Sequence, residues 1–162
     1  MASFNLPKYA SILFDTCIFI DVFGHDNKYT TFFAALNKIE ATIVSINPVK
    51  CEFIRSKTKE VIQEKSHYFD KTIESILPFD KDIESLVQPT IEEYGVDSDG
   101  LDVADIYLAC FLKKYRGLYL LTKNHHHFPE RIFSRSNIFN IELAKEIRTY
   151  AFYQYKTNQD EV

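Results

Sequence analysis

The chain has 162 residues, enough for one hydrophobic core and too few for two ordinary domains. Its hydrophobic fraction of 46%, which includes 14 Phe and 10 Tyr, excludes the composition typical of disordered proteins. The formal charge of -4 gives no overall attraction to nucleic acid, so any polyanion must bind at a local basic patch.

The cysteines and the apolar runs indicate the compartment. Cys17, Cys51 and Cys110 are widely spaced and odd in number, so they suggest neither a disulfide framework nor a zinc CxxC pair. No apolar run approaches the roughly 18 residues of a membrane span, and no signal-peptide pattern opens the chain. We therefore expect a cytoplasmic protein without membrane association, with a single domain over residues 1–156 and a frayed tail over residues 157–162.

Five short apolar runs have the length and composition of buried strands. They are Ser11 to Phe14, Thr42 to Ile46, Ile76 to Phe79, Leu118 to Thr122 and Ile138 to Ile141. Four stretches with helical spacing alternate with them, from Asn47 to about Lys65, from Lys81 to Tyr94, from Leu101 to Tyr115 and from Ile141 to Tyr155. This alternation predicts an α/β fold, a three-layer α/β/α sandwich with a central parallel five-stranded sheet.

Residues typical of helix ends support these boundaries. Asn47 and Pro48 have the pattern of an N-cap followed by a first-turn proline. Asp99 or Gly100 is expected to open the third helix, which Gly117 would close.

Asp15 ends the first predicted strand and is followed by a second apolar run. In open parallel sheets, ligand sites form beyond the carboxyl ends of strands, where the strand order reverses, so Asp15 is a candidate site residue. Asp15 could also cap a short helix that begins at Cys17 by accepting backbone N–H bonds. The sequence alone leaves both roles open.

Two acids lie at the start of the predicted helix 101–115. Asp105 falls in or beside the apolar stripe, where an unpaired carboxylate is costly, and Asp102 projects to the same side one turn earlier. Like charges at this spacing repel, and a divalent cation such as Mg²⁺ or Mn²⁺ would remove both penalties. Alternatively, Asp102 and Asp99 serve the helix N-terminus and Asp105 bonds a neighbouring backbone group.

Other polar residues follow predicted strands. Glu52 lies in the first turns of the helix that begins at Asn47, where a favourable interaction with the helix dipole is the alternative to a site role. Thr122 and Asn124 would lie beside Asp15 if the first and fourth strands are neighbours.

Three further groups have less specific patterns. His125 to His127 are predicted to form a solvent-facing loop, because consecutive side chains cannot all face one zinc ion. Asp21 is either a surface residue or an acid that supports the site. Two basic clusters are either solvated helix faces or polyanion contacts: Lys50, Arg55, Lys57 and Lys59, and Lys113, Lys114, Arg116 and Lys123.

The chain resembles the PIN-domain family in four segments with family-like order and spacing, ILFDTCIFID, NPVKCEFIR, LDVADIYLACFLKKY and LYLLTKNHHHF. The family includes metal-dependent ribonucleases and the VapC-type toxins of bacterial toxin–antitoxin pairs. The similarity covers residues 10–142, most of the chain. Matched position by position, it assigns Asp15, Glu52 and Asp105 to the family's catalytic acids.

The resemblance also assigns supporting residues. Thr16 lies in the opening D-T/S-N/S motif, where Cys17 replaces the usual small polar residue, and Thr122 and Asn124 match the T-x-D/N segment. Asn124 is neutral where many relatives have a fourth acid, and Asp102 is expected to supply that charge. The resemblance implies Asp15, Glu52 and Asp105 as metal ligands, and Asp102 is added to them as our own hypothesis.

The function implied by the resemblance is a metal-dependent endoribonuclease that uses Mg²⁺ or Mn²⁺ to hydrolyse RNA phosphodiester bonds. Its implied partners are an RNA substrate and a cognate antitoxin protein, and the aromatic content is compatible with a homodimer. The alternative is a catalytically degenerate PIN fold that binds RNA or protein without cutting, a hypothesis motivated by Cys17, Asn124 and the negative net charge.

Overall fold

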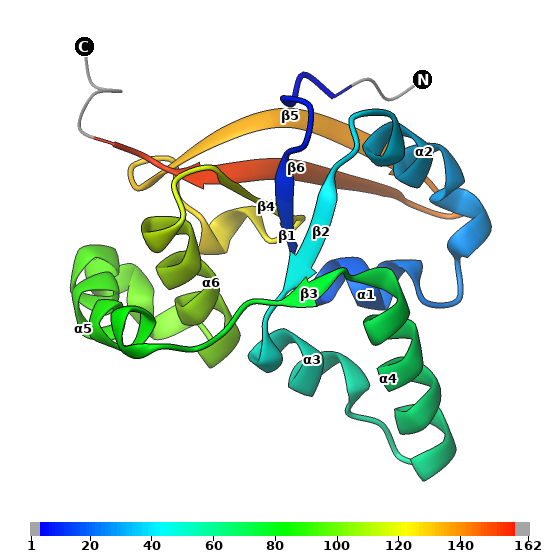
Figure 1. The fold of residues 1–162 in the computed structure, drawn as a ribbon, viewed down its shortest axis with the longest axis horizontal. Coiled ribbons are helices and arrows are strands. Elements are labelled where there is room, and N and C mark those ends of the chain that lie inside the picture. Colours follow the sequence, from blue (N-terminus) through cyan, green and yellow to red (C-terminus); the bar gives the residue numbers. More distant parts are fainter. Residues whose placement is uncertain (1–3, 158–162) are drawn as a thin grey trace.

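Residues 4–157 of the chain are described by a computed structural model, in which six strands form one sheet in the order β3-β2-β1-β4-β6-β5 (Figure 1). The strands are β1 (Ser11–Phe14), β2 (Thr42–Ser45), β3 (Ser75–Ile76), β4 (Leu118–Thr122), β5 (Phe133–Glu142) and β6 (Ile147–Tyr155). The α-helices are α1 (Thr16–Val22), α2 (Thr30–Lys38), α3 (Asn47–Ile54), α4 (Lys59–Thr72), α5 (Lys81–Tyr94) and α6 (Val103–Lys114). Short 3-10 helices occur at η1 (Asp26–Lys28), η2 (Gly95–Gly100) and η3 (His125–His127).

The parallel half of the sheet brings the predicted site residues to one edge. β1 lies between β2 and β4 and is parallel to both, with Phe14 opposite Leu121 in the register. The strand order therefore reverses at β1, and the carboxyl ends of β1, β2 and β4 meet at one edge of the sheet. The first and fourth predicted strands are neighbours, which was the condition for Thr122 and Asn124 to lie beside Asp15.

Helices cover both faces of this sheet, as the α/β/α prediction requires. On one face, the ring of Phe14 lies 6.2 Å from that of Phe32 in α2. On the other face, the Tyr155 hydroxyl donates to Glu93 of α5 at 3.0 Å, and Lys113 of α6 lies over the Tyr155 ring. In Figure 1, α5 and α6 accordingly lie to the left of the parallel strands, with α2 to the right.

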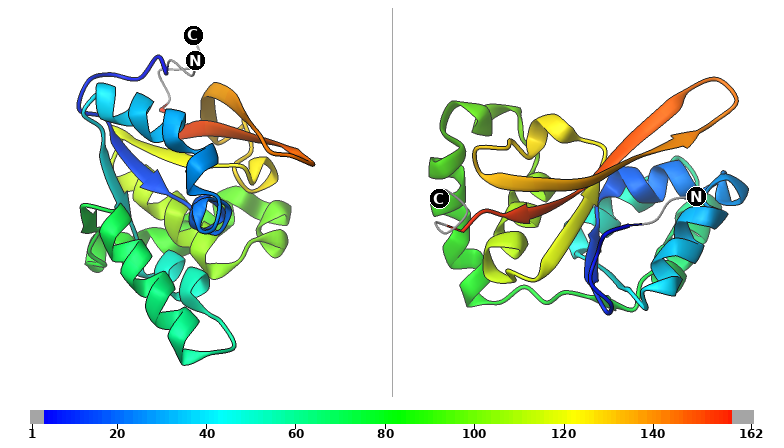
Figure 2. Two further views of the ribbon diagram at one scale, coloured as in Figure 1. Left: turned by 90° about the vertical axis from the view of Figure 1, so that its right-hand side faces the viewer. Right: turned by 90° about the horizontal axis from the view of Figure 1, so that it is seen from above.

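The C-terminal part of the sheet corrects the prediction. The predicted helix from Ile141 to Tyr155 is wrong, because this segment completes β5, turns, and forms β6, which is antiparallel to both β4 and β5. The sheet is therefore mixed and six-stranded over residues 4–157, and the predicted strand Ile138–Ile141 is part of a longer one. Residues 150–153 are all buried, so both faces of β6 are covered and the alternation typical of a strand is lost. Figure 2 shows this long ribbon extending past the helices.

The predicted helix from Asn47 to Lys65 is two helices. Residues 55–58 separate α3 from α4, because the Thr58 Oγ1 accepts a hydrogen bond from the Val61 N–H at 3.3 Å and so caps a new helix. At the start of α3, Ile46 holds the N-cap position, so Asn47 is the first helical residue instead of the cap.

One strand and two helices also differ from the prediction. The strand predicted from Ile76 to Phe79 is wrong except at Ile76, because β3 is only Ser75–Ile76. α6 begins after Asp102, which caps it, and not at Asp99 or Gly100. No element was predicted for the segment that forms α2, because it opens with two threonines and two phenylalanines, which are weak helix formers.

Three remaining points concern the termini, the helices and the cysteines. The predicted tail, 157–162, lies outside the described residues apart from Thr157. Within residues 4–157, none of the helices is long and apolar enough to cross a membrane. Cys17, Cys51 and Cys110 are all free thiols.

Candidate active site

Asp15 directly follows β1 and is only 2% exposed. Its Oδ1 accepts a hydrogen bond from the Thr16 N–H at 2.6 Å, so Asp15 is the N-cap of α1. Its other oxygen, Oδ2, accepts from the Thr122 hydroxyl at 2.6 Å and from the Asn124 Nδ2 at 3.3 Å. Asp15 therefore serves as a helix cap and also lies among residues from the end of β4.

Cys17, Thr122 and Asn124 enclose the Asp15 carboxylate. The Thr122 Oγ1 also accepts from the Asn124 N–H at 2.9 Å, and the Cys17 Sγ lies 3.5 Å from both Asp15 Oδ2 and Thr122 Oγ1. Burial, and then the charge of Asp15, raise the pKa of the Cys17 thiol well above its usual range. Because only a thiolate is an effective nucleophile, Cys17 is a packing and hydrogen-bonding residue here.

Glu52 lies on α3 and joins Asp15 through Thr16. The Thr16 hydroxyl donates to Glu52 Oε2 at 2.6 Å, while the Thr16 N–H donates to Asp15. Burial raises the pKa of the half-buried Glu52, as do the charges of Asp102 and Asp15, whereas the Thr16 hydrogen bond and Arg55 lower it. Thr16 thus holds two of the predicted acids in fixed positions.

Asp102 and Asp105 form a capping box at the N-terminus of α6. The Asp105 N–H donates to Asp102 Oδ1 at 2.9 Å, and the Asp102 N–H donates to Asp105 Oδ2 at 3.2 Å. Asp105 is 3% exposed, whereas Asp102 is exposed. Asp102 therefore caps the helix N-terminus, as the alternative interpretation of the sequence expected. Asp99, which the same interpretation placed there, lies in η2 and outside the helix.

Burial and the charges of neighbouring acids raise the pKa of Asp15, Glu52 and Asp105. Burial is the largest cause at Asp105, and the charges of Asp102 and Asp15 add to it, so that the pKa of Asp105 is raised to about 7. Burial, with a contribution from Asp102, also raises the pKa of Asp15. No lysine or arginine within residues 4–157 forms an ion pair with Asp15, Glu52, Asp102 or Asp105. The negative charge of these acids therefore has no lysine or arginine as an ion-pair partner among the described residues.

The solvent-facing loop predicted for the three histidines is wrong for two of them. Only His126 is exposed, and the His125 Nδ1 lies 2.7 Å from the Tyr153 hydroxyl. The His127 Nδ1 lies 2.8 Å from Asp105 Oδ2, so His127 borders the candidate site. The sequence signal that could have placed His127 beside the site was its position just after β4, because the carboxyl end of this strand was already expected to face the site.

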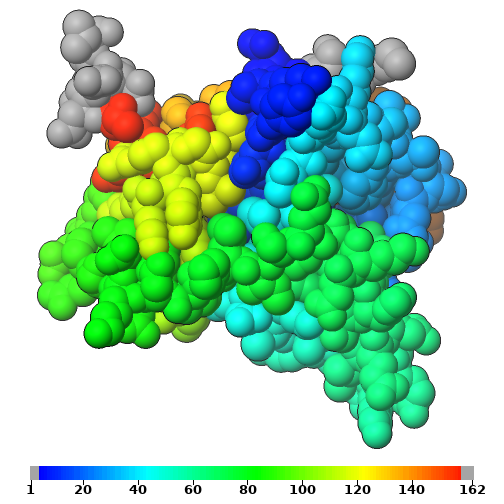
Figure 3. Space-filling model, in the orientation of Figure 1, coloured from blue at the N-terminus to red at the C-terminus, as the bar shows by residue number. Residues whose placement is uncertain are grey.

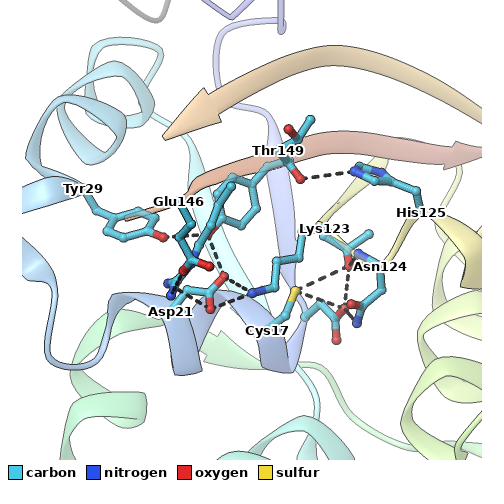
Figure 4. Close-up of polar contacts among 12 residues, drawn as sticks. Cys17, Asp21, Tyr29, Lys123, Asn124, His125, Glu146 and Thr149 are labelled. Atoms are coloured by element: carbon cyan, nitrogen blue, oxygen red, sulfur yellow. Dashed lines mark hydrogen bonds and ion pairs between the residues drawn. The ribbon is translucent and has the colours of Figure 1, made fainter. Parts of the chain in front are cut away.

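Asp21 is a buried acid of a different kind, and its environment was not predicted. It lies on α1, is 4% exposed, and pairs with Lys123 at 2.6 Å and Arg148 at 3.1 Å. The Tyr150 hydroxyl donates to the same carboxylate at 2.7 Å. Figure 4 shows Lys123 extending from the end of β4 to Asp21. Asp21 therefore joins α1 to β4 and β6 and is neither a surface residue nor a part of the acidic site.

The two basic clusters differ in how their charges are used. The three lysines of the second cluster pair with acids, so their charge is neutralised locally. In the first cluster, Arg55, Lys57 and Lys59 are exposed around the connection between α3 and α4. This connection lies at the tip of a projection, seen at the bottom of Figure 3, and it follows the helix that carries Glu52.

The donor set of the site fits a hard divalent cation. Its oxygens belong to carboxylates, which are typical ligands of Mg²⁺ and Mn²⁺, and their charge is not neutralised by lysine or arginine. The His127 Nδ1 is shielded from solvent and lacks a hydrogen-bond partner, so it is a further available donor atom. No three His, Cys, Asp or Glu side chains among residues 4–157 are already arranged as a metal-binding group, so binding would require side chains to turn towards the ion.

Comparison with known proteins gives one match. The model of a protein family described as the PIN domain matches residues 12–131, which is more than half of the chain and contains every residue of the candidate site. Searches of curated proteins and of solved structures found no significant match.

Proposed function

Because this chain belongs to the PIN-domain family, we propose that it is a metal-dependent endoribonuclease that hydrolyses RNA phosphodiester bonds. PIN domains are generally nucleases that use divalent metal ions and act on RNA or DNA. The observation that carries the proposal is the set formed by the buried acids Asp15 and Asp105 and the half-buried Glu52, whose pKa values are raised by burial and by the charges of neighbouring acids. A module that only binds has no need to maintain this costly charge, so we favour the enzyme over the degenerate binding module.

In this proposal Asp15, Glu52 and Asp105 are the catalytic acids and hold the metal ion, with Asp102 as a fourth ligand. A bound divalent cation would lower the pKa of a coordinated water and offset negative charge on the phosphoryl oxygens. The hydrogen bonds from Thr16 orient Glu52 and Asp15. Thr122 and Asn124 hold the second oxygen of Asp15 from the side of β4. The protonated thiol of Cys17 takes no part as a nucleophile.

The RNA is proposed to lie across the acidic edge and the projecting connection between α3 and α4. Arg55, Lys57 and Lys59 are exposed there and are suited to contact the phosphate backbone. Such contacts provide affinity without reading the base sequence, and they explain how a chain with a charge of -4 can bind a polyanion.

The test is cleavage of total RNA by purified protein with Mg²⁺ or Mn²⁺, repeated with EDTA. We expect metal-dependent cleavage that Asp15→Asn reduces by at least about 100-fold, because Asp15 contacts most of the site. Asp99→Asn is the matched control, since Asp99 is an exposed acid in η2, three positions before Asp102 in the sequence and outside the site. Cleavage that survives EDTA, or that is unchanged in Asp15→Asn, would contradict the proposal.

The proposed partner is a cognate antitoxin protein, which PIN nucleases often have. Under this proposal the chain is the toxin of a toxin–antitoxin pair and works in the cytoplasm, and a short antitoxin reading frame lies beside its own. Expression of the chain alone should stop growth, and co-expression of the neighbouring frame should restore it. A neighbouring frame without this effect would contradict the toxin role and leave the nuclease proposal in place.

A further inference from the structure

His127 is held against Asp105 by a fixed backbone. It belongs to η3, directly after β4, and its carbonyl oxygen accepts a hydrogen bond from the Tyr94 hydroxyl at 2.7 Å. Its Nδ1 lies 2.8 Å from Asp105 Oδ2, while Asp105 itself is 3% exposed. The imidazole therefore contacts the same carboxylate oxygen that accepts the hydrogen bond from the Asp102 N–H.

This close approach is not an ordinary hydrogen bond. The His127 Nδ1 is shielded from solvent, yet it has no partner with hydrogen-bond geometry. A buried ring nitrogen left in this state is costly, and such groups in native proteins usually have an identifiable reason. If Nδ1 carries a lone pair, that lone pair and the Asp105 oxygen repel each other, and a cation bound to both atoms would remove the repulsion.

We propose that His127 Nδ1 and Asp105 Oδ2 are adjacent ligands of one divalent cation, an inference that rests on the proposed function. Two neighbouring ligands at about 2.1 Å from an octahedral ion are about 3.0 Å apart, close to the separation of these two atoms. The neutral imidazole supplies one lone pair, and the other ring nitrogen carries the proton.

The nitrogen ligand also defines which metal the site selects. Carboxylate oxygens alone suit Mg²⁺, whereas imidazole nitrogen suits transition metals, whose affinity for mixed nitrogen and oxygen sites is higher. The site therefore prefers a transition-metal dication to Mg²⁺, and His127 is the residue that sets this preference.

The experiment is pulsed electron paramagnetic resonance of Mn²⁺ bound to the full chain, with calorimetric titration of Mn²⁺ and Mg²⁺. We expect the spectrum of the wild type to contain the modulation of a directly bound nitrogen, which shifts when the histidines are labelled with ¹⁵N. His127→Gln should lose this signal and weaken Mn²⁺ binding at least about tenfold, with a smaller loss for Mg²⁺. His126→Gln is the matched control, because His126 is the exposed neighbour and should retain the signal.

The outcomes separate this inference from the proposed function. Mn²⁺ binding that Asp15→Asn abolishes, but without nitrogen modulation in the wild type, would overturn the role of His127 and leave the nuclease proposal in place. A wild type that binds no Mn²⁺ would overturn both. Weaker binding in His127→Gln with the nitrogen signal retained would make His127 a positioning residue for Asp105, which also overturns the inference.

Discussion

Asp15 and Asp21 lie at opposite ends of one short helix and are about equally buried, at 2% and 4% exposure, yet they differ in what surrounds them. Asp21 has two cations, Lys123 and Arg148, and a tyrosine hydroxyl. Asp15 has hydrogen bonds but no ion pair from the described residues, and acids lie nearby. Burial alone therefore does not distinguish the two acids, and the lack of an ion-pair partner among the described residues is what makes Asp15 the candidate site residue.

Asp15 and Asp21 have different partners because of the strand geometry at the end of β4. Successive side chains of an extended segment point to opposite sides. Thr122 and Asn124 accordingly contact Asp15, while Lys123 between them contacts Asp21. The lysine nearest in sequence to the acidic site is thus directed away from it, and the site keeps its negative charge.

The largest expected effect comes from removing the carboxylate of Asp21. Asp21→Asn would leave Lys123 and Arg148 around a neutral side chain and should lower the free energy of unfolding by about 3 kcal/mol. Urea unfolding measures this change, with Asp99→Asn as the control that should alter stability by less than about 0.5 kcal/mol. Equal stability of Asp21→Asn and the control would show that the ion pairs contribute nothing.

Metal binding at the acidic site that contains Asp15 is expected to stabilise the protein. At a Mn²⁺ concentration about 100 times the Kd, the free energy of unfolding should rise by about 2.7 kcal/mol, because the folded state alone binds the ion. Asp15→Asn should lose this increase, and Asp21→Asn should keep it. The same increase in all three proteins would mean that the ion binds elsewhere.

Without metal, the acidic centre should make stability depend on pH. The pKa of Asp105 is raised to about 7 in the folded protein, so the folded state binds the proton more tightly than the unfolded state. The free energy of unfolding should therefore fall as the pH rises from about 4 to about 7. Asp105→Asn should stabilise the metal-free protein by about 2 kcal/mol at pH 8 and have little effect at pH 4. A loss of stability that is equal at both pH values would contradict this account.

The smallest expected effect is that of Lys123→Met, since Lys123 is one of two cations on Asp21 and is partly exposed. We expect a loss of about 1 kcal/mol in the free energy of unfolding. Mn²⁺ affinity measured by calorimetry should stay within about twofold, because Lys123 makes no ion pair with the acidic site. A larger rise in Mn²⁺ affinity would indicate that the charge of Lys123 acts on the acidic site.

The sequence predicted which acids the fold groups together better than it predicted the C-terminal half of the fold. Asp15 directly follows an apolar strand, Glu52 lies on the short helix that follows another, and Asp105 lies in the first turn of a helix. These local signals do not depend on tertiary contacts. β6 was mistaken for a helix because both its faces are buried, which removes the alternating pattern. The partners of Asp21 and the contact between His127 and Asp105 join residues 22 to 129 positions apart, and no local pattern encodes them.

Calorimetric titration of Mn²⁺ into the metal-free protein tests most directly whether the acidic site of Asp15, Glu52 and Asp105 holds a divalent cation. We expect saturable binding in the wild type and in Asp99→Asn, and at least about tenfold weaker binding in Asp15→Asn. Absence of binding in the wild type, or the same affinity in Asp15→Asn, would contradict this expectation.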